Sequence, residues 1–393
     1  MSEPIDFEEY LKSNYPQLNS TPFFDYHLTA PISSQQIQII KQFGQKLIPS
    51  PHSSEEQSDF DRTLALLRAT IAELFSTNLI NYSVVLFQTP EAAVDTLFES
   101  FPWRNDSHYI IDPDFQKFVH LTPSTFNFPH KVGATQLLQE STTFSEAIQK
   151  MPKLKSQSLL LTSYTKGQES IDAAFQFQKQ GLGLHHVLFD ATPAVPFHFP
   201  NLSMHPFNYY LISLKKICGI EFSALLIKHQ AAEQLKPQFY GGGAVAFSCA
   251  RNLTHRPFSS NSKRLENGTP SLISIFGSYR GVIDVMKFVN SPINISGQTL
   301  TLSQNVDMLM KKLVDGLNQL GKNIQCEINE WTKEVTLQFT DPQDAKELQK
   351  KFIANQVIVG VTDDNKLCAS FGFGVREVDV NRFIEVTQII LSA

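Results

Sequence analysis

Asp190 and Lys216 lie at the carboxyl ends of two apolar strands. A charged side chain that is buried there needs a group to pair with. Asp190 ends the run HVLFD, and ligands of open α/β sheets bind outside the carboxyl ends of strands. An unpaired buried carboxylate is costly, so a protonated pyridine nitrogen would suit it. Lys216 follows the strand NYYLISL, and a lysine at such an edge can form an imine with an aldehyde cofactor. Simpler interpretations stay open: Asp190 as a helix cap or turn residue, and Lys215 with Lys216 as a solvated turn.

Two glycine-containing motifs lie further along the chain. FYGGGAV (239–245) has three consecutive glycines, which adopt conformations closed to other residues and let another chain approach closely. RLENGTP (264–270) offers a backbone N–H at Gly268 and a hydroxyl at Thr269, both suited to phosphate oxygens. Taken singly, the first also fits a flexible loop and the second a turn between helices. The order of the four signals carries more weight than any one of them.

Short apolar strands alternate with helices in the first two thirds of the chain. Apolar residues at three- and four-residue spacing predict a helix from Glu56. Strands are predicted at 83–87, 108–112, 158–164, 185–191, 208–214 and 221–227, with helices opening at Pro90 and over 168–180. Strands that are apolar on both faces suit a sheet covered by helices on both sides, and the alternation suits mainly parallel pairing.

The chain changes character near residue 270. Helices are predicted from Leu272 and over Asn305–Leu320, followed by strands at 335–339, 357–361 and 367–373, a helix opening at Asp341–Pro342, and a last helix to the C-terminus. This pattern predicts a small α+β domain (271–393) beside a large domain (51–270) and an N-terminal arm (1–50). The arm mixes turn-rich pieces with one short helical stretch.

Composition excludes several classes of protein. The 393 residues carry a net charge of -5 without a basic stripe, which argues against nucleic acid as a partner. The four cysteines form no CxxC pair, and the adjacent His185 and His186 point to opposite faces of a strand, so neither a disulfide framework nor a metal site is expected. No run of 18 apolar residues and no signal peptide are present, so we expect no membrane span and a cytoplasmic protein.

The motifs together resemble one family over nearly the whole chain. They are FFDYHLTAPISSQQ, SPHS (50–53), VVLFQTPEAAVDTLFESFPW, LISLKKICG, FYGGGAV, RLENGTPSLISI and ASFGFGVREVDVNRFIEV. The sequence resembles the class V aminotransferase group of pyridoxal-phosphate (PLP) enzymes, which includes cysteine desulfurases, and is most similar to the N-terminal domain of molybdenum cofactor sulfurases. The resemblance implies fold type I with a mainly parallel seven-stranded sheet, the cofactor pyridoxal 5'-phosphate, a small-molecule substrate, and a homodimer with its sites between subunits.

The resemblance also implies a role for individual residues. Lys216 matches the Schiff-base lysine and Asp190 the partner of the ring nitrogen, which keeps that nitrogen protonated. Gly268 and Thr269 match a contact offered to the phosphate of the neighbouring subunit. The remaining cofactor positions are Thr89, Phe115 as the stacking aromatic residue, Ser213 at the phosphate, and Lys215.

The sequence departs from the family mainly where the substrate binds. Tyr164 replaces an asparagine that faces the cofactor, and Cys368 replaces the arginine that grips a substrate carboxylate, which removes the strongest amino-acid recognition element. His27 replaces a small residue, and Glu91 stands in the first phosphate loop in place of a threonine. The segment between the strands at 357–361 and 367–373 is too short for the loop that carries a persulfide cysteine. Cys368 itself is expected to be buried and inert.

Two hypotheses for function follow. The first is a PLP-dependent transferase or lyase that acts on a small amine or a sulfur-containing amino acid through a Schiff base with Lys216. The second is a degenerate, non-catalytic member that retains the dimeric scaffold.

Overall fold

The structure is a computed structural model of the chain. It describes residues 5–45, 59–104, 106–112, 115, 133–136, 146, 148, 157–181, 183–249, 251–252, 254–289, 291–295, 297–321, 324–339, 344–362 and 364–392. The SPHS stretch at 50–53 and the predicted helix start at Asp341–Pro342 lie outside these residues.

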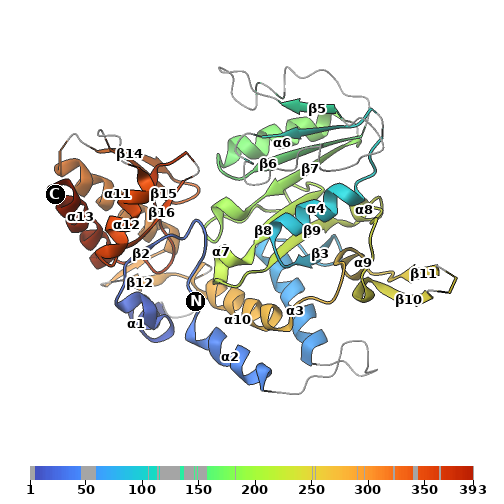
Figure 1. Cartoon of the computed structure of the whole chain (residues 1–393), viewed down its shortest axis with the longest axis horizontal. Helices are drawn as coiled ribbons and strands as arrows, with labels where there is room; N and C mark the ends of the chain where they lie inside the picture. The colour runs from blue at the N-terminus through green and yellow to red at the C-terminus, as the bar shows by residue number, and fades with distance from the viewer. Residues whose placement is uncertain are drawn as a thin grey trace.

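A seven-stranded sheet forms the centre of the large domain (Figure 1). From one edge to the other, its strands are β3 (Tyr82–Phe87), β9 (Ser223–Lys228), β8 (Tyr209–Ser213), β7 (His185–Asp190), β6 (Ser158–Ser163), β4 (His108–Ile111) and β5 (Gly133–Gln136). Strands β8, β7, β6, β4 and β5 pair in parallel, whereas β9 runs antiparallel to both of its neighbours. The predicted mainly parallel sheet is therefore confirmed.

Helices cover both faces of this sheet because its strands are apolar on both sides. Successive residues of a strand point to opposite faces, so Ile212 joins one core cluster and Leu211 the other. The first cluster includes α3 (Asp59–Leu74), α6 (Gln168–Gln180) and α10 (Leu272–Val289). The second includes α4 (Pro90–Ser100), α8 (His229–Ala232) and α9 (Asn261–Leu265).

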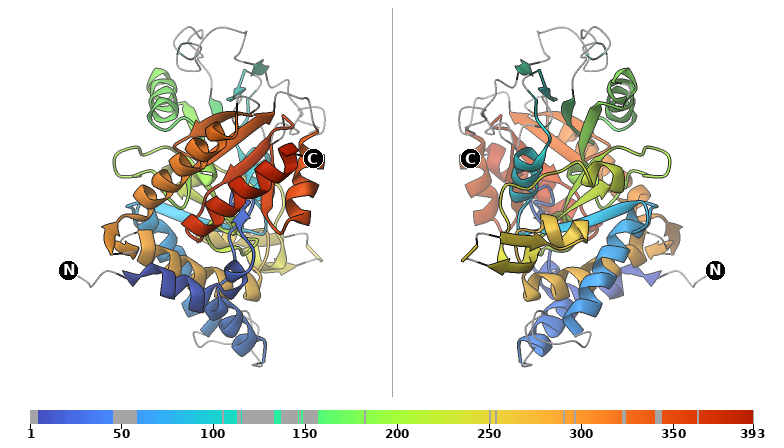
Figure 2. Two further views of the ribbon diagram at one scale, coloured as in Figure 1. Left: turned by 90° about the vertical axis from the view of Figure 1, so that its left-hand side faces the viewer. Right: turned by 90° about the vertical axis from the view of Figure 1, so that its right-hand side faces the viewer.

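A five-stranded sheet organises the C-terminal part of the chain (Figure 2). Its order is β14 (Ile324–Asn329), β15 (Glu334–Phe339), β17 (Leu367–Ser370), β16 (Ile358–Val361) and β2 (Phe23–Phe24), with helices α11 (Leu302–Gln319), α12 (Ala345–Ala354) and α13 (Glu377–Ser392). Strand β2 comes from the N-terminal arm and pairs in parallel with β16. The arm is thus built into the small domain, although the domain boundaries at 50 and 270 remain predictions.

The N-terminal arm contains two α-helices, so the prediction of one short helical stretch is wrong. Helix α1 (Phe7–Asn14) begins after Asp6, whose side chain caps the N–H of Glu9, and α2 (Ser34–Gly44) begins with a capping box between Ser33 and Gln36. Helix α2 packs against α10 at one end of the molecule (Figure 1).

Several short elements were not predicted. They are β1 (Ile5–Asp6), β12 (Ile293–Ile295) and β13 (Gln298–Leu300) in a small sheet, the antiparallel hairpin β10 (Val245–Cys249) and β11 (Thr254–Pro257), the short helix α7 (Leu214–Cys218), and the 3-10 turns η1 (Pro16–Asn19), η3 (Thr192–Ala194) and η4 (Gly242–Ala244). Their apolar runs are too short to show a period.

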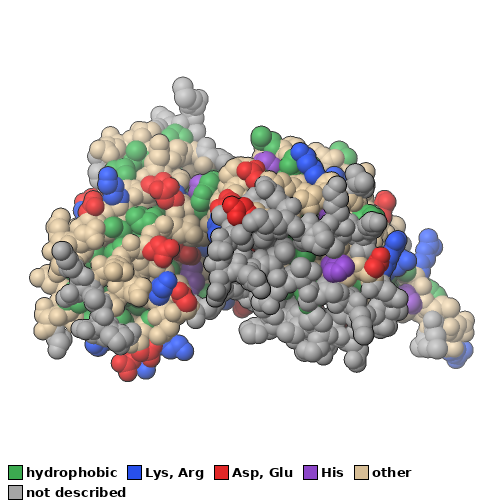
Figure 3. Space-filling view, turned by 90° about the horizontal axis from the view of Figure 1, so that it is seen from above, with side chains coloured by type: hydrophobic (Ala, Val, Ile, Leu, Met, Phe, Trp, Pro, Cys, Tyr) green, Lys and Arg blue, Asp and Glu red, His purple; other side chains and the backbone are tan. Residues whose placement is uncertain are grey.

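The surface is mixed in charge. On the face shown in Figure 3, acidic and basic side chains of the described residues are interspersed. Within the same residues, none of the helices combines the length and the apolar character that crossing a membrane requires.

Candidate functional site

Asp190 and Lys216 come from neighbouring parallel strands and lie at the same edge of the large sheet. Strand β7 ends at Asp190, which is level with Leu211 in β8. Strand β8 ends at Ser213 and continues directly into α7, where Lys216 is buried with 7% of its surface exposed. A lysine placed in the turn after one strand therefore lies beside an aspartate at the end of the next.

The turn η3 brings the two functional groups together. The Nζ of Lys216 donates a hydrogen bond to the carbonyl oxygen of Pro193 at 2.5 Å, and Oδ1 of Asp190 accepts the N–H of Thr192 at 2.9 Å. The hydroxyl of Thr192 also accepts the N–H of Ser213 at 3.0 Å, which fixes the end of β8 against the same turn. The ammonium and the carboxylate thus approach one short segment from two sides.

The two adjacent lysines differ in environment. The side chain of Lys215 is 41% exposed, and its Nζ lies 3.7 Å from the carboxylate of Glu221, which is also exposed. Lys216 is the buried one of the pair, and it is the one beside η3. Only Lys216 has the environment of a functional amine.

Asp190 shares one face of the sheet with three serine side chains. Leu188 belongs to the cluster beside α4, so alternation places Asp190 on that face too. Ser163 is level with Asp190 across β6 and β7, and Ser213 is level with Ser223 across β8 and β9. The same alternation puts all three serines on the face of Asp190.

Two of these hydroxyls lack a partner within the described residues. The Oγ atoms of Ser163 and Ser223 are buried and make no hydrogen bond there. Buried polar atoms are nearly always satisfied, so an orphaned pair beside a buried carboxylate is what a site built for a polar ligand leaves. The donor set of an acid, an amine and hydroxyls fits a phosphorylated pyridine aldehyde.

The two glycine motifs meet in space. A Cβ at Gly241 would lie 1.8 Å from the carbonyl oxygen of Asn267, and a Cβ at Gly243 would lie 2.6 Å from the N–H nitrogen of Thr269. Both positions therefore require glycine because the ENGT backbone passes directly over them. The order of motifs along the sequence reflects a real contact between them.

A buried ion pair anchors the ENGT loop to the large sheet. Oε1 of Glu266 lies 2.6 Å from Nη2 of Arg68 and accepts the N–H of Leu86 at 3.0 Å. Burial raises the pKa of Glu266, and the neighbouring Arg68 guanidinium opposes that rise. Thr269, further along the loop, is exposed, and a Cβ at Gly268 would meet no atom within 4 Å. The loop is fixed at its start and open at its tip.

The remaining cofactor candidates surround α4. The hydroxyl of Thr89 caps this helix by accepting the N–H of Ala92 at 3.2 Å, and Glu91 is exposed in its first turn. Phe115 is 2% exposed in the apolar cluster on the α4 face, and its N–H donates to the carbonyl oxygen of Asp112. Thr89 and Phe115 thus belong to the same side of the sheet as Asp190.

Tyr164 is directed differently from the other candidates. Its N–H donates to the carbonyl oxygen of Asp190, but its ring packs on Phe189 and on Trp331, with centroids 5.5 Å and 5.4 Å away. Burial raises the pKa of Tyr164. Trp331 belongs to the turn between β14 and β15, so Tyr164 lies where the small domain touches the large one.

The five-stranded sheet brings together the substrate-side candidates His27 and Cys368. The N–H of His27 donates to Oγ of Ser370 at 2.7 Å, and Cys368 is level with Gly360 in the neighbouring strand. A Cβ at Gly360 would lie 2.2 Å from Cε1 of His27, so the imidazole lies directly over that glycine. Asp25 completes the group, with Oδ1 3.0 Å from Nδ1 of His27.

Cys368 carries a buried thiol. It is 1% exposed, and burial raises its pKa well above the ordinary value. The carboxylates of Glu334 and Asp25 add to this rise and the ammonium of Lys216 opposes it. A thiol that stays protonated is a poor nucleophile, as the sequence predicted for this position. The ammonium of Lys216 thus acts on a residue of the five-stranded sheet.

Comparison with known proteins agrees with this geometry. No family model matches the chain. It is 25% identical over 309 residues to the molybdenum cofactor sulfurase of Danio rerio, which covers 71% of this chain and 36% of that protein. Its structure superposes on apo cysteine desulfurase from Thermococcus onnurineus NA1 with a TM-score of 0.81, at 12% identity and 100% coverage of both chains. A variant of C-DES with glycine covalently linked to its PLP cofactor gives a TM-score of 0.71, at 14% identity, covering 96% and 98% of the two chains.

The chain is a homologue of molybdenum cofactor sulfurases with the fold of cysteine desulfurases. The resemblance to the class V group and the fold type I architecture are therefore confirmed. The homologue spans between 36% and 40% of the length of the curated relatives it matches.

Three residues of this sulfurase homologue escaped the sequence analysis. Thr192 joins Asp190 to Ser213, Asp25 pairs with His27, and Trp331 covers Tyr164. The Thr-Pro pair after Asp190 was a usable signal for a turn at the strand's end. Asp25 and Trp331 reach the site because segments that are distant in sequence pack together. No motif close to either residue in the sequence indicated this.

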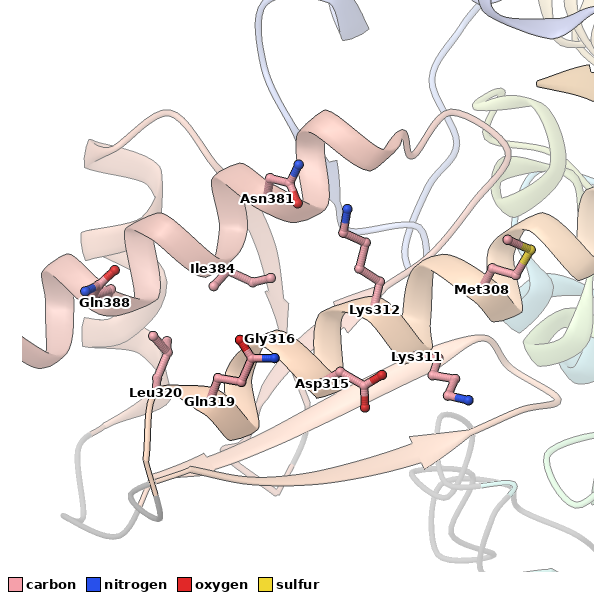
Figure 4. A pocket seen from close by; sticks show the side chains of 10 residues that line it. All are labelled: Met308, Lys311, Lys312, Asp315, Gly316, Gln319, Leu320, Asn381, Ile384 and Gln388. Atoms are coloured by element: carbon pink, nitrogen blue, oxygen red, sulfur yellow. The ribbon is translucent and has the colours of Figure 1, made fainter. Parts of the chain in front are cut away.

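Other polar clusters and cavities lie away from this site. Among the described residues, no group of three or more His, Cys, Asp or Glu side chains is placed to hold a metal ion. His185 stacks on Phe177 and His186 on Tyr209. Figure 4 shows a groove between α11 and α13 lined by residues that include Asp315 and Ile384, on the small domain. It contains none of the candidate residues.

Proposed function

We propose that this sulfurase homologue is a PLP-dependent transferase or lyase that acts on a small amine or a sulfur-containing amino acid. The observation that carries the proposal is the convergence of Lys216 Nζ and Asp190 Oδ1 on one turn from adjacent strands. An amine and an acid in this relation can serve one pyridine aldehyde, the amine at its carbonyl and the acid at its ring nitrogen.

The residues on the α4 face fit the rest of that cofactor. The buried hydroxyls of Ser163 and Ser223 have no protein partner in the described residues, and Ser213 ends β8 level with Ser223. In this proposal Ser213, with Thr89 at the start of α4, binds the phosphate, and Phe115 contacts the ring. When bound, PLP supplies an electron sink for a substrate carbanion.

The chain's own groups then have distinct tasks. Asp190 holds a proton on the ring nitrogen because a carboxylate favours the charged form of its partner. Lys216 carries the cofactor covalently at Nζ and moves protons to and from the substrate. Gly268 and Thr269, at the open tip of the ENGT loop, are offered to the phosphate of a second copy of the chain in a homodimer.

One observation favours the second hypothesis, a non-catalytic scaffold. Cys368 is buried with a raised pKa, and β16 and β17 are separated by a short connection. Neither feature provides a mobile thiolate to carry a persulfide. A protein that binds PLP but turns over neither amines nor cysteine would establish this alternative.

The test of the proposal is the absorbance of the purified protein. The protein incubated with PLP should show a visible band that survives gel filtration, and Lys216→Ala should abolish it. Lys215→Ala is the matched control, because it removes the adjacent exposed amine, and it should keep the band. A protein that stays colourless with added PLP, or a band lost in Lys215→Ala alone, would overturn the assignment.

A further inference from the structure

Asp25 and His27 form a polar pair at the point where the N-terminal arm crosses the site. Asp25 is level with Ser370 in β17, and the N–H of His27 donates to the hydroxyl of the same serine. Three residues on, the N–H of Ala30 donates to the carbonyl oxygen of Lys215 at 2.9 Å. The arm therefore runs from the five-stranded sheet to α7, which carries Lys216, and Asp25 and His27 lie between these two contacts.

The side chains of Asp25 and His27 are close together, but they are not oriented for a hydrogen bond. Oδ1 of Asp25 and Nδ1 of His27 are 3.0 Å apart, which is the distance of an ion pair, yet the angles do not make a hydrogen bond and both atoms are buried. The two side chains are 17% and 13% exposed. Two half-satisfied polar groups at this position retain hydrogen-bonding capacity for a third group.

The charges around this end of the site are mainly negative. The carboxylates of Asp25, Glu334 and Asp364 all contribute to raising the pKa of Cys368. Lys216 is the one cation that contributes to lowering it. Lys216 is the lysine assigned to the cofactor under the proposed function. Among the described residues, a substrate carboxylate placed here would face these acids, and the one cation that acts on Cys368 is the lysine assigned to the cofactor.

Three cations of the small domain are already paired. Lys366 lies 2.9 Å from Asp364, and Arg376 lies 3.0 Å from Asp379. Lys333 is buried with its Nζ 2.6 Å from Asp307. Recruiting one of them for a carboxylate would break an existing ion pair.

We propose that Asp25 and His27 recognise the end of the substrate remote from its reacting amine, and that they accept a neutral or cationic hydrogen-bond donor in place of a carboxylate. The substrate class is then a small primary amine without an α-carboxylate. This inference rests on the proposed function, because it takes the Lys216 edge as the reacting end. It goes beyond that function by separating amines from amino acids.

The test compares ethanolamine with L-serine, which differ only in the carboxylate. Each is titrated into the PLP-loaded protein, and binding is read from the shift of the visible band. Ethanolamine should bind about tenfold more tightly or better, a difference of about 1.4 kcal/mol. L-serine binding equally or more tightly would overturn the inference, even if Lys216 holds the cofactor.

Two variants test which carboxylate sets the preference for ethanolamine over L-serine. Asp25→Asn keeps the size of the side chain and removes its charge, and it should reduce the preference for ethanolamine about tenfold, which corresponds to one unit of log affinity. Glu385→Gln is the matched control, because that carboxylate is 64% exposed, is paired with Arg382 and does not act on Cys368, and it should leave the preference unchanged. An unchanged preference in Asp25→Asn would remove Asp25 from the recognition site.

A readout without the cofactor keeps the two proposals separable. The imidazole NMR signals of His27 can be followed in cofactor-free protein during the same two titrations. Saturable shifts with ethanolamine and none with L-serine would support the inference even in a protein that stays colourless with PLP. Shifts with L-serine of equal or higher affinity would contradict it there as well.

Discussion

The cofactor side and the substrate side of the site are built in different ways. Asp190, Ser213 and Lys216 come from two adjacent strands and the turn after them, within one sheet. His27 and Cys368 come from the two ends of the chain and meet because β2 joins the five-stranded sheet. The first side retains the residues of the class V pattern and the second has departed from it. A substrate wall assembled from separate segments can change without disturbing the strands that hold the cofactor.

The largest effect should come from the ion pair that fixes the cofactor side. Arg68→Ala leaves Glu266 buried without its cation, and breaking a buried pair in this way costs about 3–5 kcal/mol of unfolding free energy. Urea denaturation of the variant and the wild type measures the loss. Arg62→Ala removes an exposed arginine from the same helix and should cost less than about 0.5 kcal/mol. Similar losses in both variants would show that the ENGT loop does not depend on this anchor.

The next effect separates two buried aspartates, Asp190 at the end of β7 and Asp112 just after β4, whose strands are separated by β6. Asp190→Asn should weaken PLP retention by about 10- to 100-fold, because a hydrogen bond to a charged group contributes about 1.5–3 kcal/mol. Asp112→Asn is the control: Asp112 accepts from the hydroxyl of Thr162 at 2.6 Å, and Thr162 is level with Phe189, so this acid belongs to the other face of the sheet. Equilibrium dialysis against PLP gives both affinities. Equal losses would place the cofactor elsewhere.

Acid should weaken the sheet that carries the cofactor side. Burial lowers the pKa of His186 to about 4, and it hydrogen-bonds Tyr209 and Gln157. The folded state therefore binds the proton less readily than the unfolded state, whose histidine titrates near 6.5. Stability is present above that value and falls as the pH drops toward 4, by about 1–2 kcal/mol between pH 7 and pH 5.

Urea midpoints of the wild type and of His186→Gln at the two pH values measure this contribution. The glutamine keeps a hydrogen-bonding side chain but does not titrate. The variant should lose about 1–2 kcal/mol less than the wild type over this interval, after its lower starting stability is subtracted. An identical pH dependence in both proteins would show that His186 does not control the acid response.

The same contrast explains which parts of the site were predictable from sequence. Asp190 and Lys216 end apolar strands, so strand pairing alone brings them to one edge. The contact between Gly241 and Asn267 was not predicted, although both motifs that form it were singled out. The pairing of Asp25 with Ser370, or of Trp331 with Tyr164, depends on how a distant segment docks, and no local pattern encodes that. Helix α1, which Asp6 caps, was missed because it is short.

The smallest effect concerns the one departure from the family pattern on the cofactor side. Glu91 is exposed in the first turn of α4, where a carboxylate favours the helix but repels a phosphate bound nearby. Glu91→Gln should raise the affinity for PLP about 2- to 5-fold at low salt, and the gain should vanish at about 0.5 M salt because exposed charges are screened. Glu99→Gln, in the last turn of the same helix, should change the affinity by less than about 2-fold, since the interaction falls off over its length. A gain from Glu99→Gln equal to that from Glu91→Gln would mean that net charge, and not the placement of Glu91, sets the phosphate affinity.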